Sequence, residues 1–339
     1  MGDKWRRQVK SRRISKKLGI TVFCVLALGM GLIIALHHNP LADPREELIK
    51  KIISCSVILI SCILFWRLYD KLVVLPAELY QSRRLIWKLA KNDFKKRYAG
   101  SYLGAVWAMV QPVVTVVMYW IIFEKVFGGS GPRGEQGVEV PFLLFLTAGL
   151  VPWFYFNEAL TNGTNALLEY NYLVKKVVFK ISILPIIKVI AATFIHAFFV
   201  CILLVVAGGY GYYPNLYTLQ LLYYSACLFI FVLALSYTTC ALVVFFRDLS
   251  QIISIALQIG MWMTPIMWNI EEFQNPWVVL LKLNPLVYIV SGYRSAIYEH
   301  TWFWEDFYST MYFWIITMVL FGLGALIFKR LKVHFADVL

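Results

Sequence analysis

The sequence predicts an all-α integral membrane protein. Of its 339 residues, 60% are hydrophobic and only 15% are charged, and the mean hydropathy is +0.69. A water-soluble domain usually has about 25% charged residues, so this composition excludes a soluble globular protein. The formal net charge is +13. Because the cytoplasmic loops of membrane proteins retain Lys and Arg, we attribute this charge to loop position and not to a nucleic-acid ligand.

Eight apolar runs are long enough to cross a membrane as helices, since a hydrocarbon core of about 30 Å takes roughly 20 helical residues. The predicted spans are 18–36, 49–69, 103–123, 142–168, 183–207, 219–246, 252–268 and 311–328. The second has the shortest apolar core and needs Arg67 and Lys71 to extend toward the headgroups. The first has a basic flank but no small-residue cleavage site after it, which favours an uncleaved anchor over a signal peptide.

The basic residues predict the orientation of these spans. Residues 1–17 contain eight Lys or Arg and one acidic residue, and 67–98 contains nine basic and three acidic residues. The alternate segments have no excess of basic residues; they are 124–141, 208–218 and 269–310. We therefore expect both termini in the cytoplasm.

The spans also predict two modules. Residues 1–78 form a basic cytoplasmic arm and an extra two-span hairpin, and residues 79–339 form a six-span body. Segment 269–310 is rich in aromatic residues. We expect it to dip into the bilayer as short broken helices, which is possible only where protein or water satisfies the backbone.

Residues 79–98 are too charged to span and predict an amphipathic helix. At helical spacing one face collects the apolar residues Ile86, Trp87, Ala90, Phe94 and Tyr98. Another face carries a basic stripe, defined as Arg84, Lys88, Lys91 and Lys95. Such a helix lies along the membrane interface with its basic residues toward anionic headgroups. The alternative is an ordinary solvated helix beside the membrane.

Signals of catalysis and of metal binding are missing from the sequence. It has no GxxxxGKS/T phosphate loop, no HExxH, GxSxG or GxGxxG motif, and no cysteine spacing typical of a metal site. The adjacent acidic pairs Glu271–Glu272 and Glu305–Asp306 would diverge by about 100° on a helix, so loop acidity is the simpler explanation. The sequence therefore predicts a chain that is not an enzyme and has no cofactor or metal of its own.

Polar residues inside apolar runs are costly and so carry information about function. In the third span one helical seam contains Gly104, Trp107, Gln111, Thr115, Met118 and Ile122. In the seventh span a similar seam contains Gln251, Ser254, Gln258 and Trp262. Such seams suit the path of a hydroxyl-rich, elongated solute, but they also suit contacts between neighbouring helices. Both interpretations stay open.

Other polar residues lie in the fourth and fifth spans: Asn157, Glu158, Asn162, Lys188 and His196. Glu158 is the residue whose burial in hydrocarbon costs the most free energy. The sequence favours neither a position on a translocation path nor a position away from it. Lys188 is expected to extend toward the cytoplasm. For His196, a hydrogen bond between helices is favoured over a proton relay.

Several motifs, in their order along the chain, resemble one family of membrane transporters. They are LIWKLAKNDFKKRY at 85–98, SYLGAVW at 101–107, QP at 111–112, GLVPWF at 149–154, FFRDL at 245–249, TPI at 264–266, NPL at 284–286 and GYR at 292–294. This series is similar to the permeases of type-2 ABC (ABC-2) exporters that move lipid-linked polysaccharides, over about residues 79–339. The stretches 293–297 and 334–337 are most similar to the wall teichoic acid branch, while the O-antigen and capsule branches stay open.

The resemblance implies a fold, partners and a location. The fold is a six-helix ABC-2 type transmembrane domain, here preceded by the extra two-helix hairpin and the amphipathic interfacial helix. The partners are a second copy of the chain and two separate ATP-binding cassette subunits, which bind ATP and Mg. The substrate is a polyprenyl-diphosphate-linked polymer, and the location is the cytoplasmic membrane of a bacterium.

Two rival classes are less well supported. An integral-membrane glycosyl or acyl transferase would need carboxylates or His clustered at one membrane face, and the sequence has no such cluster. A secondary transporter would favour inverted repeats, and none is visible.

The residue patterns and the resemblance together predict roles for named residues. A substrate path would contain Trp107, Gln111, Thr115, Tyr119, Trp120, Phe123, Glu158, Gln251, Ser254, Gln258 and Trp262. The basic stripe would bind the lipid diphosphate. Coupling to the ATPase would use Glu169, Tyr170, Tyr172, Leu173, Lys175 and Lys176. Segment 269–310, with Tyr293 and Arg294, would act as an outer gate.

Overall fold

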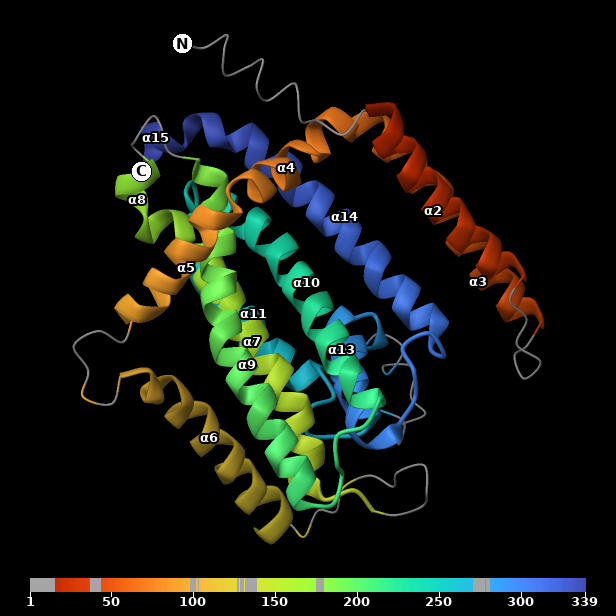
Figure 1. Ribbon diagram of the computed structural model, residues 1–339, viewed down its shortest axis with the longest axis vertical. Helices are drawn as coiled ribbons and strands as arrows, with labels where there is room; N and C mark the ends of the chain where they lie inside the picture. The colour runs from red at the N-terminus through yellow and green to blue at the C-terminus, as the bar shows by residue number, and fades with distance from the viewer. Residues whose placement is uncertain are drawn as a thin grey trace. The chain divides into compact units, whose positions relative to one another are not determined.

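The computed structural model of the chain describes residues 16–36, 44–97, 102, 104–126, 128, 131, 139–174, 180–270, 278 and 281–339. Within these ranges the regular secondary structure is helical and no β-strand occurs (Figure 1). The predicted all-α fold is confirmed. Close contacts within the chain divide it into two compact units, one ending at Gln81 and the other beginning at Ser82.

The first unit contains a helical hairpin. Helices α2 (Lys16–Leu36) and α3 (Pro44–Leu72) pack against each other, and the short helix α4 (Val74–Gln81) follows. The rings of Phe23 and Phe65 stack between α2 and α3 with centroids 3.9 Å apart. The expected pair of helices therefore forms, while its insertion in a membrane and its status as a separate module stay predictions.

The second unit contains the remaining helices. Helix α5 (Arg83–Arg97) comes first, and α6 (Trp107–Trp120) follows and continues as a wider π-helical turn, Ile121–Val126. The others are α7 (Phe142–Glu169), α8 (Asn171–Val174), α9 (Leu184–Gly209), α10 (Gln220–Val243), α11 (Leu249–Met263), α13 (Pro285–Arg294), α14 (Phe307–Leu331) and α15 (Phe335–Val338).

Five helical segments of the described chain are long and apolar enough to cross a membrane. They are Trp107–Val126, Phe142–Glu169, Ile181–Gly209, Tyr217–Val243 and Phe307–His334. These segments correspond to five of the eight predicted spans.

The predicted seventh span, 252–268, is too long. Helix α11 ends at Met263, and Thr264 has an extended backbone with φ −93° and ψ 133°. The cause is Pro265, whose ring disfavours helical geometry at the residue before it. The apolar segment therefore continues as an irregular turn, and α11 is a short apolar helix.

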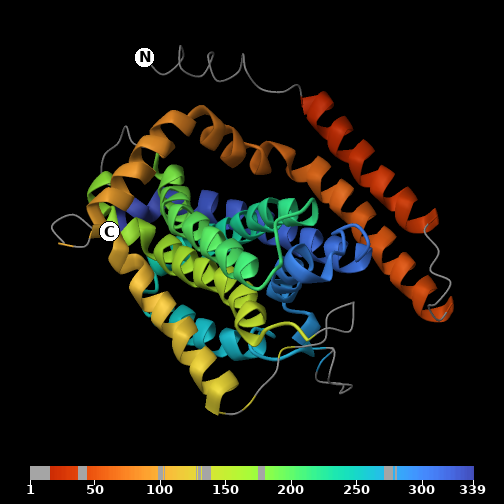
Figure 2. The same cartoon turned by 60° about the horizontal axis from the view of Figure 1, so that its bottom comes forward.

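Helix α7 forms the centre of the second unit, and α6 lies at its edge. In its most apolar stretch 78% of the α7 residues are buried, whereas none of the α6 residues is. Figures 1 and 2 show α7 beside α9, with α6 at the edge of this unit. Helix α11 buries only Leu257 among its residues. The two helices with predicted polar seams are thus poorly covered by their own chain.

Small residues let the central helices approach closely. The Thr164 hydroxyl of α7 lies 2.7 Å from the Thr239 hydroxyl of α10, so the two groups share a hydrogen bond. Beside it, Gly163 leaves room for Ser236, because a Cβ at position 163 would collide with the Ser236 hydroxyl. This contact between α7 and α10 supports the wall on which the candidate site is built.

Candidate substrate cavity and coupling network

A cavity of about 370 Å³ lies between α6, α7 and α9, beside the end of α5. Its wall combines aromatic and polar side chains, among them Trp107, Gln111, Phe154, Tyr155, Asn157, Glu158, Thr161, Asn162 and His196. The structure therefore brings together three residues of the predicted path: Trp107, Gln111 and Glu158. Their role in transport stays a prediction.

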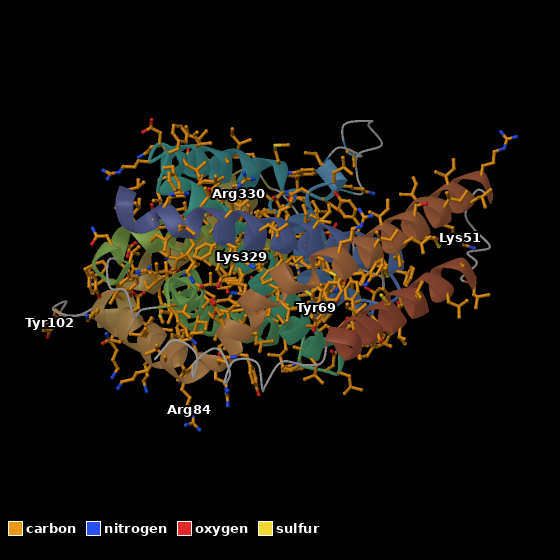
Figure 3. The ribbon with its side chains drawn as sticks, turned by 90° about the horizontal axis from the view of Figure 1, so that it is seen from above. Lys51, Tyr69, Arg84, Tyr102, Lys329 and Arg330 are labelled. Carbon is orange, nitrogen blue, oxygen red and sulfur yellow. The ribbon has the colours of Figure 1, made fainter. Side chains whose placement is uncertain are left out.

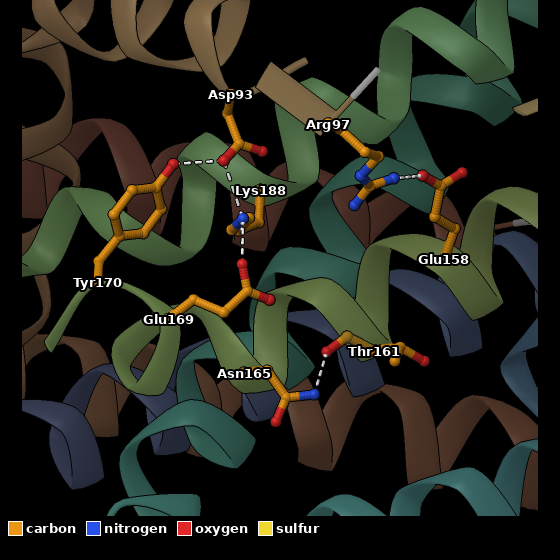
Figure 4. Close-up of polar contacts among 8 residues, drawn as sticks. All are labelled: Asp93, Arg97, Glu158, Thr161, Asn165, Glu169, Tyr170 and Lys188. Carbon is orange, nitrogen blue, oxygen red and sulfur yellow. Dashed lines mark hydrogen bonds and ion pairs between the residues drawn. The ribbon is translucent and has the colours of Figure 1, made fainter. Parts of the chain in front are cut away.

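The wall of the cavity also contains an ion pair that joins two helices. Arg97, the last residue of α5, donates from its guanidinium to the Glu158 carboxylate in α7 (Figure 4). The side chains are 32% and 26% exposed, so water or lipid reaches them only in part. Nothing in the sequence pairs Arg97 with Glu158, because 60 residues separate the two positions and Arg97 belongs to a strongly basic segment.

In the C-terminal half of α6 and the turn after it, polar side chains form hydrogen bonds within the same segment. The Thr115 hydroxyl donates to the Gln111 carbonyl at 2.9 Å, and the Trp120 indole N–H donates to Glu124 at 2.6 Å. Tyr119 and Phe123 meet edge to face with centroids 6.2 Å apart. By contrast, the ring of Trp107 at the other end of the helix is 54% exposed beside the cavity.

The polar seam of α11 lies outside the cavity. Gln251, Gln258 and Trp262 are exposed, and Trp262 is the most exposed of the helix's large apolar side chains at 64%. The Ser254 hydroxyl donates to the Ser250 carbonyl at 3.0 Å. The wall of this cavity therefore contains residues of the α6 seam and none of the α11 seam.

Helix α5 is amphipathic, and its basic stripe is exposed. All four residues of the stripe are exposed, and Arg84 points away from the second unit (Figure 3). The buried face packs against α9 through Ile86, Ala90 and Asp93. Trp87 and Phe94 both meet the ring of Phe194 edge to face. Trp87 is nonetheless 58% exposed, and Tyr98 lies outside the described residues.

Lys188 corrects one expectation from the sequence. Instead of extending toward solvent, its ammonium is buried, 2.8 Å from the Asp93 carboxylate and 2.6 Å from the Glu169 carboxylate (Figure 4). The Tyr170 hydroxyl donates to the same Asp93 oxygen that Lys188 approaches. Burial raises the pKa of Tyr170, and the neighbouring Asp93 carboxylate raises it further, so the hydroxyl keeps the proton that it donates.

This coupling network, defined as Asp93, Glu169, Tyr170 and Lys188, joins four parts of the chain. Asp93 belongs to α5, Glu169 ends α7, Tyr170 begins the turn into α8, and Lys188 belongs to α9. Two of the residues predicted to contact the ATPase, Glu169 and Tyr170, are thus tied to the interfacial helix.

The remaining predicted coupling residues lie on or after α8. On α8 itself, Tyr172 is 52% exposed and Leu173 is half-buried. Lys175 and Lys176 lie outside the described residues. A role of this segment in coupling stays a prediction.

The family described as ABC-2 type transporter matches residues 84–298, which include α5, the cavity and the coupling network. The chain belongs to the ABC-2 type transporter family. The resemblance predicted from the motifs is thereby confirmed.

Similar proteins include three curated permeases. An "O-antigen export system permease protein RfbA" from Myxococcus xanthus is 29% identical over 268 residues, which cover 78% of this chain and 99% of that protein. Two proteins of the same name from Klebsiella pneumoniae are each 27% identical and cover 75% of this chain and 95% of their own length.

Several motifs of this ABC-2 chain meet where α11 ends. The Asn284 side chain donates to the Thr264 hydroxyl at 3.0 Å, and Arg294 donates to the Ile266 carbonyl at 2.8 Å. Gly149 of α7 faces the same residue, since a Cβ there would lie 3.1 Å from Ile266 Cγ2. Motifs that are far apart in the sequence therefore fix the irregular turn after α11.

The two predicted gate residues lie in the interior of this ABC-2 chain. Tyr293 has no exposed surface, and its hydroxyl lies 2.6 Å from the Ser225 hydroxyl and 2.9 Å from His196 Nε2. Arg294 is 5% exposed, with its guanidinium 3.7 Å above the Phe145 ring. Both side chains hold α13 in the interior of the described chain, and a role of either one as an outer gate stays a prediction. The favoured interpretation of His196, a hydrogen bond between helices, agrees with these contacts.

Proposed function

We propose that this chain is the transmembrane subunit of an ABC exporter that carries a polyprenyl-diphosphate-linked cell-surface polysaccharide across a bacterial cytoplasmic membrane. The observation that carries the proposal is the polar cavity with its ion pair, set between the helices of an ABC-2 chain. Polar and ionisable groups inside membrane spans are energetically costly, and they often mark the pathway of a substrate. The names of the three relatives support a polysaccharide as the cargo.

The names of the same relatives support one class of polymer. An O-antigen-like polysaccharide is the first candidate, because the relatives are named for O-antigen export and match nearly their whole length. Wall teichoic acid is the second candidate, favoured by the stretches 293–297 and 334–337. Export assays with each lipid-linked polymer distinguish the two.

The poorly covered helices support a homodimer. Helix α6 buries none of its side chains and α11 buries one, yet both carry large exposed apolar residues such as Val114 and Ile255. A second copy that covers these helices would also bring the α6 and α11 seams to a common interface, where they would line the path. Cytoplasmic termini and two separate ATP-binding subunits complete the proposed transporter.

The coupling network supports a route from ATP hydrolysis to the substrate. A bound ATPase subunit would contact α8, where Tyr172 is exposed. Movement of α8 would reach α5 through Tyr170 and Asp93, which are hydrogen-bonded. The basic stripe of α5 would hold the lipid diphosphate at the inner leaflet, because several cations near a membrane surface attract anionic headgroups.

Charge reversal of the basic stripe tests this function. In the transporter reconstituted with its ATPase subunit, Lys88→Glu, Lys91→Glu and Lys95→Glu together should abolish export while the ATPase subunit still co-purifies. The control is Lys329→Glu with Arg330→Glu, which reverses two exposed charges at the end of α14 (Figure 3). Normal export by the triple variant, or nucleotide hydrolysis by the purified chain alone, would overturn the proposal.

A further inference from the structure

We propose that each copy of the chain contains its own subsite for a neutral sugar ring, in the cavity between α6, α7 and α9. This inference rests on the proposed function and deepens it. The ligand would be the sugar next to the lipid diphosphate. All side chains of the subsite would come from one protomer, so a dimer would contain two subsites.

The first argument is a set of side-chain amides that make no hydrogen bond with the described residues. Gln111, Asn157 and Asn162 line the cavity, and among the described residues the structure records no hydrogen bond from their side chains. Asn165, one turn farther along α7, shows the contrast. Its amide nitrogen donates to the Thr161 carbonyl at 3.0 Å and its amide oxygen accepts from Ser250 at 2.8 Å.

Gln111 and Asn157 are exposed and Asn162 is half-buried, so these side chains are open to a ligand that enters the cavity. Each amide offers both donors and an acceptor. Sugar hydroxyls also donate and accept, so a sugar ring satisfies several such amides at once. These amides therefore point to a hydroxyl-rich ligand.

The second argument is that the cavity has no excess charge. Arg97 and Glu158 compensate each other, and His196 already uses Nε2 in contacts with Tyr293 at 2.9 Å and Ser225 at 3.1 Å. A phosphate in the cavity would have to separate Arg97 from Glu158 and would lie close to a carboxylate. Separating a partly buried ion pair is costly, so a neutral ligand is favoured.

The third argument is the position of the cavity relative to the basic stripe. Lys95, the last residue of the stripe, lies on the same helix as Arg97 and two residues before it. Lys95 is exposed, whereas Arg97 reaches the cavity wall. Lys95 and Arg97 point about 200° apart around α5 but lie only about 3 Å apart along its axis, so a diphosphate bound at Lys95 would lie close to the end of the helix that borders the cavity.

The size and the aromatic wall agree with this ligand. At about 370 Å³ the cavity is near the lower end of ligand pockets, which range over about 300–1,000 Å³, and it suits one or two rings but not a polymer. Trp107 and Phe154 offer flat apolar surfaces to the C–H face of a sugar. The subsite would thus recognise the first sugar and not the repeating polymer.

The test uses the complete transporter in lipid nanodiscs, with ATPase stimulation as the readout. The two probes are polyprenyl diphosphate that carries one hexose and polyprenyl diphosphate without sugar. In Asn157→Ala with Asn162→Ala, we expect the half-maximal concentration of the hexose probe to rise about tenfold or more, and that of the sugar-free probe to stay within about twofold. The matched control is Asn92→Ala, an exposed amide on α5 outside the cavity.

A second variant keeps the inference testable if the first one folds poorly. Glu158→Gln removes the carboxylate that pairs with Arg97 and so changes the net charge of the cavity wall by one positive unit. We expect this variant to respond to lower concentrations of the sugar-free diphosphate and to higher concentrations of the hexose probe.

The outcomes separate the inference from the proposed function. An equal shift for both probes, or no shift for the hexose probe in either variant, overturns the sugar subsite. If the unmodified transporter responds to neither probe and exports no lipid-linked polymer, the proposed function itself fails.

Discussion

Lys188 of α9 and Asp93 of α5 form a buried ion pair, with the Lys188 Nζ 2.8 Å from the Asp93 Oδ1. The pair fixes the interfacial helix to a membrane-spanning helix at one point on its buried face. Glu169 and Tyr170 share the same two charged groups, so the end of α7 joins the contact. A displacement of α8 therefore cannot leave α5 unaffected unless this network breaks.

Removal of Lys188 should destabilise the protein strongly. Lys188→Met keeps most of the side-chain volume but leaves the buried Asp93 carboxylate without its cation, a loss of about 3–5 kcal/mol for a buried pair. The loss is measured as the difference in the free energy of unfolding between Lys188→Met and the wild type in mixed micelles.

The control for this change is Lys329→Met at an exposed position of α14, where we expect a change within about 0.5 kcal/mol. The double variant Lys188→Met with Asp93→Asn should recover part of the loss, because no buried charge then remains. Equal stability of Lys188→Met and the wild type would show that the pair has no structural role.

The Tyr170 hydroxyl should make stability depend on pH at the alkaline end. Its pKa is raised in the folded protein, so its contribution is complete below the unfolded pKa of about 10 and is lost as the pH rises toward the folded pKa. The thermal midpoints of wild type and Tyr170→Phe, compared from pH 7 to 11, isolate this group from the other tyrosines. The difference should be constant up to about pH 10 and should shrink above it. A difference that grows above pH 10 contradicts the assignment.

Gly292 should not tolerate a larger residue. A Cβ at this position in α13 would collide with the aromatic ring of Tyr224, which is buried and has little room to move. We expect Gly292→Ala to lower the free energy of unfolding by about 1–3 kcal/mol, the usual cost of overpacking. Gly208→Ala in α9 is the control, because no atom lies within 4 Å of its added Cβ. That change should be neutral or slightly stabilising.

Arg294 should resist replacement even by Lys. Its planar guanidinium stacks 3.7 Å above Phe145 and also donates to the Ile266 carbonyl, a combination that an ammonium does not reproduce. We expect Arg294→Lys to cost about 2 kcal/mol, the size of a desolvated cation–π contact. Arg330→Lys, at an exposed position, should leave the melting temperature unchanged. If both variants melt together with the wild type, the turn after α11 does not depend on Arg294.

The amphipathic helix α5 shows which structural features can be predicted from residue spacing alone. The sequence predicted a helix close to α5 and an exposed basic stripe on it, since both follow from a repeat of about 3.6 residues. It gave no role to Asp93, although this residue lies on the buried face seven positions after Ile86. One acidic residue among lysines looks like part of a solvated surface until its partner, 95 positions away, is placed beside it.

The predicted path and gate also show which properties residue spacing predicts and which depend on the three-dimensional structure. The α6 seam was found from the cost of polar residues in an apolar run, and Trp107 and Gln111 do line a cavity. Tyr293 and Arg294 were expected at a gate because of the segment that contains them, and the structure shows both side chains buried in the interior. The sequence contains no signal that separates a polar residue on a cavity wall from one in a packed interior.

The sequence by itself determined the helical membrane fold, the basic interfacial helix and the family. These properties depend on the hydropathy, the charge and the spacing of residues that are close together in the sequence. Only the tertiary structure decided which charges compensate each other: Lys188 with Asp93 and Glu169, and Arg97 with Glu158. The physical reason is that electrostatic energy depends on the distance between charges in space and on their burial, and neither follows from distance along the chain.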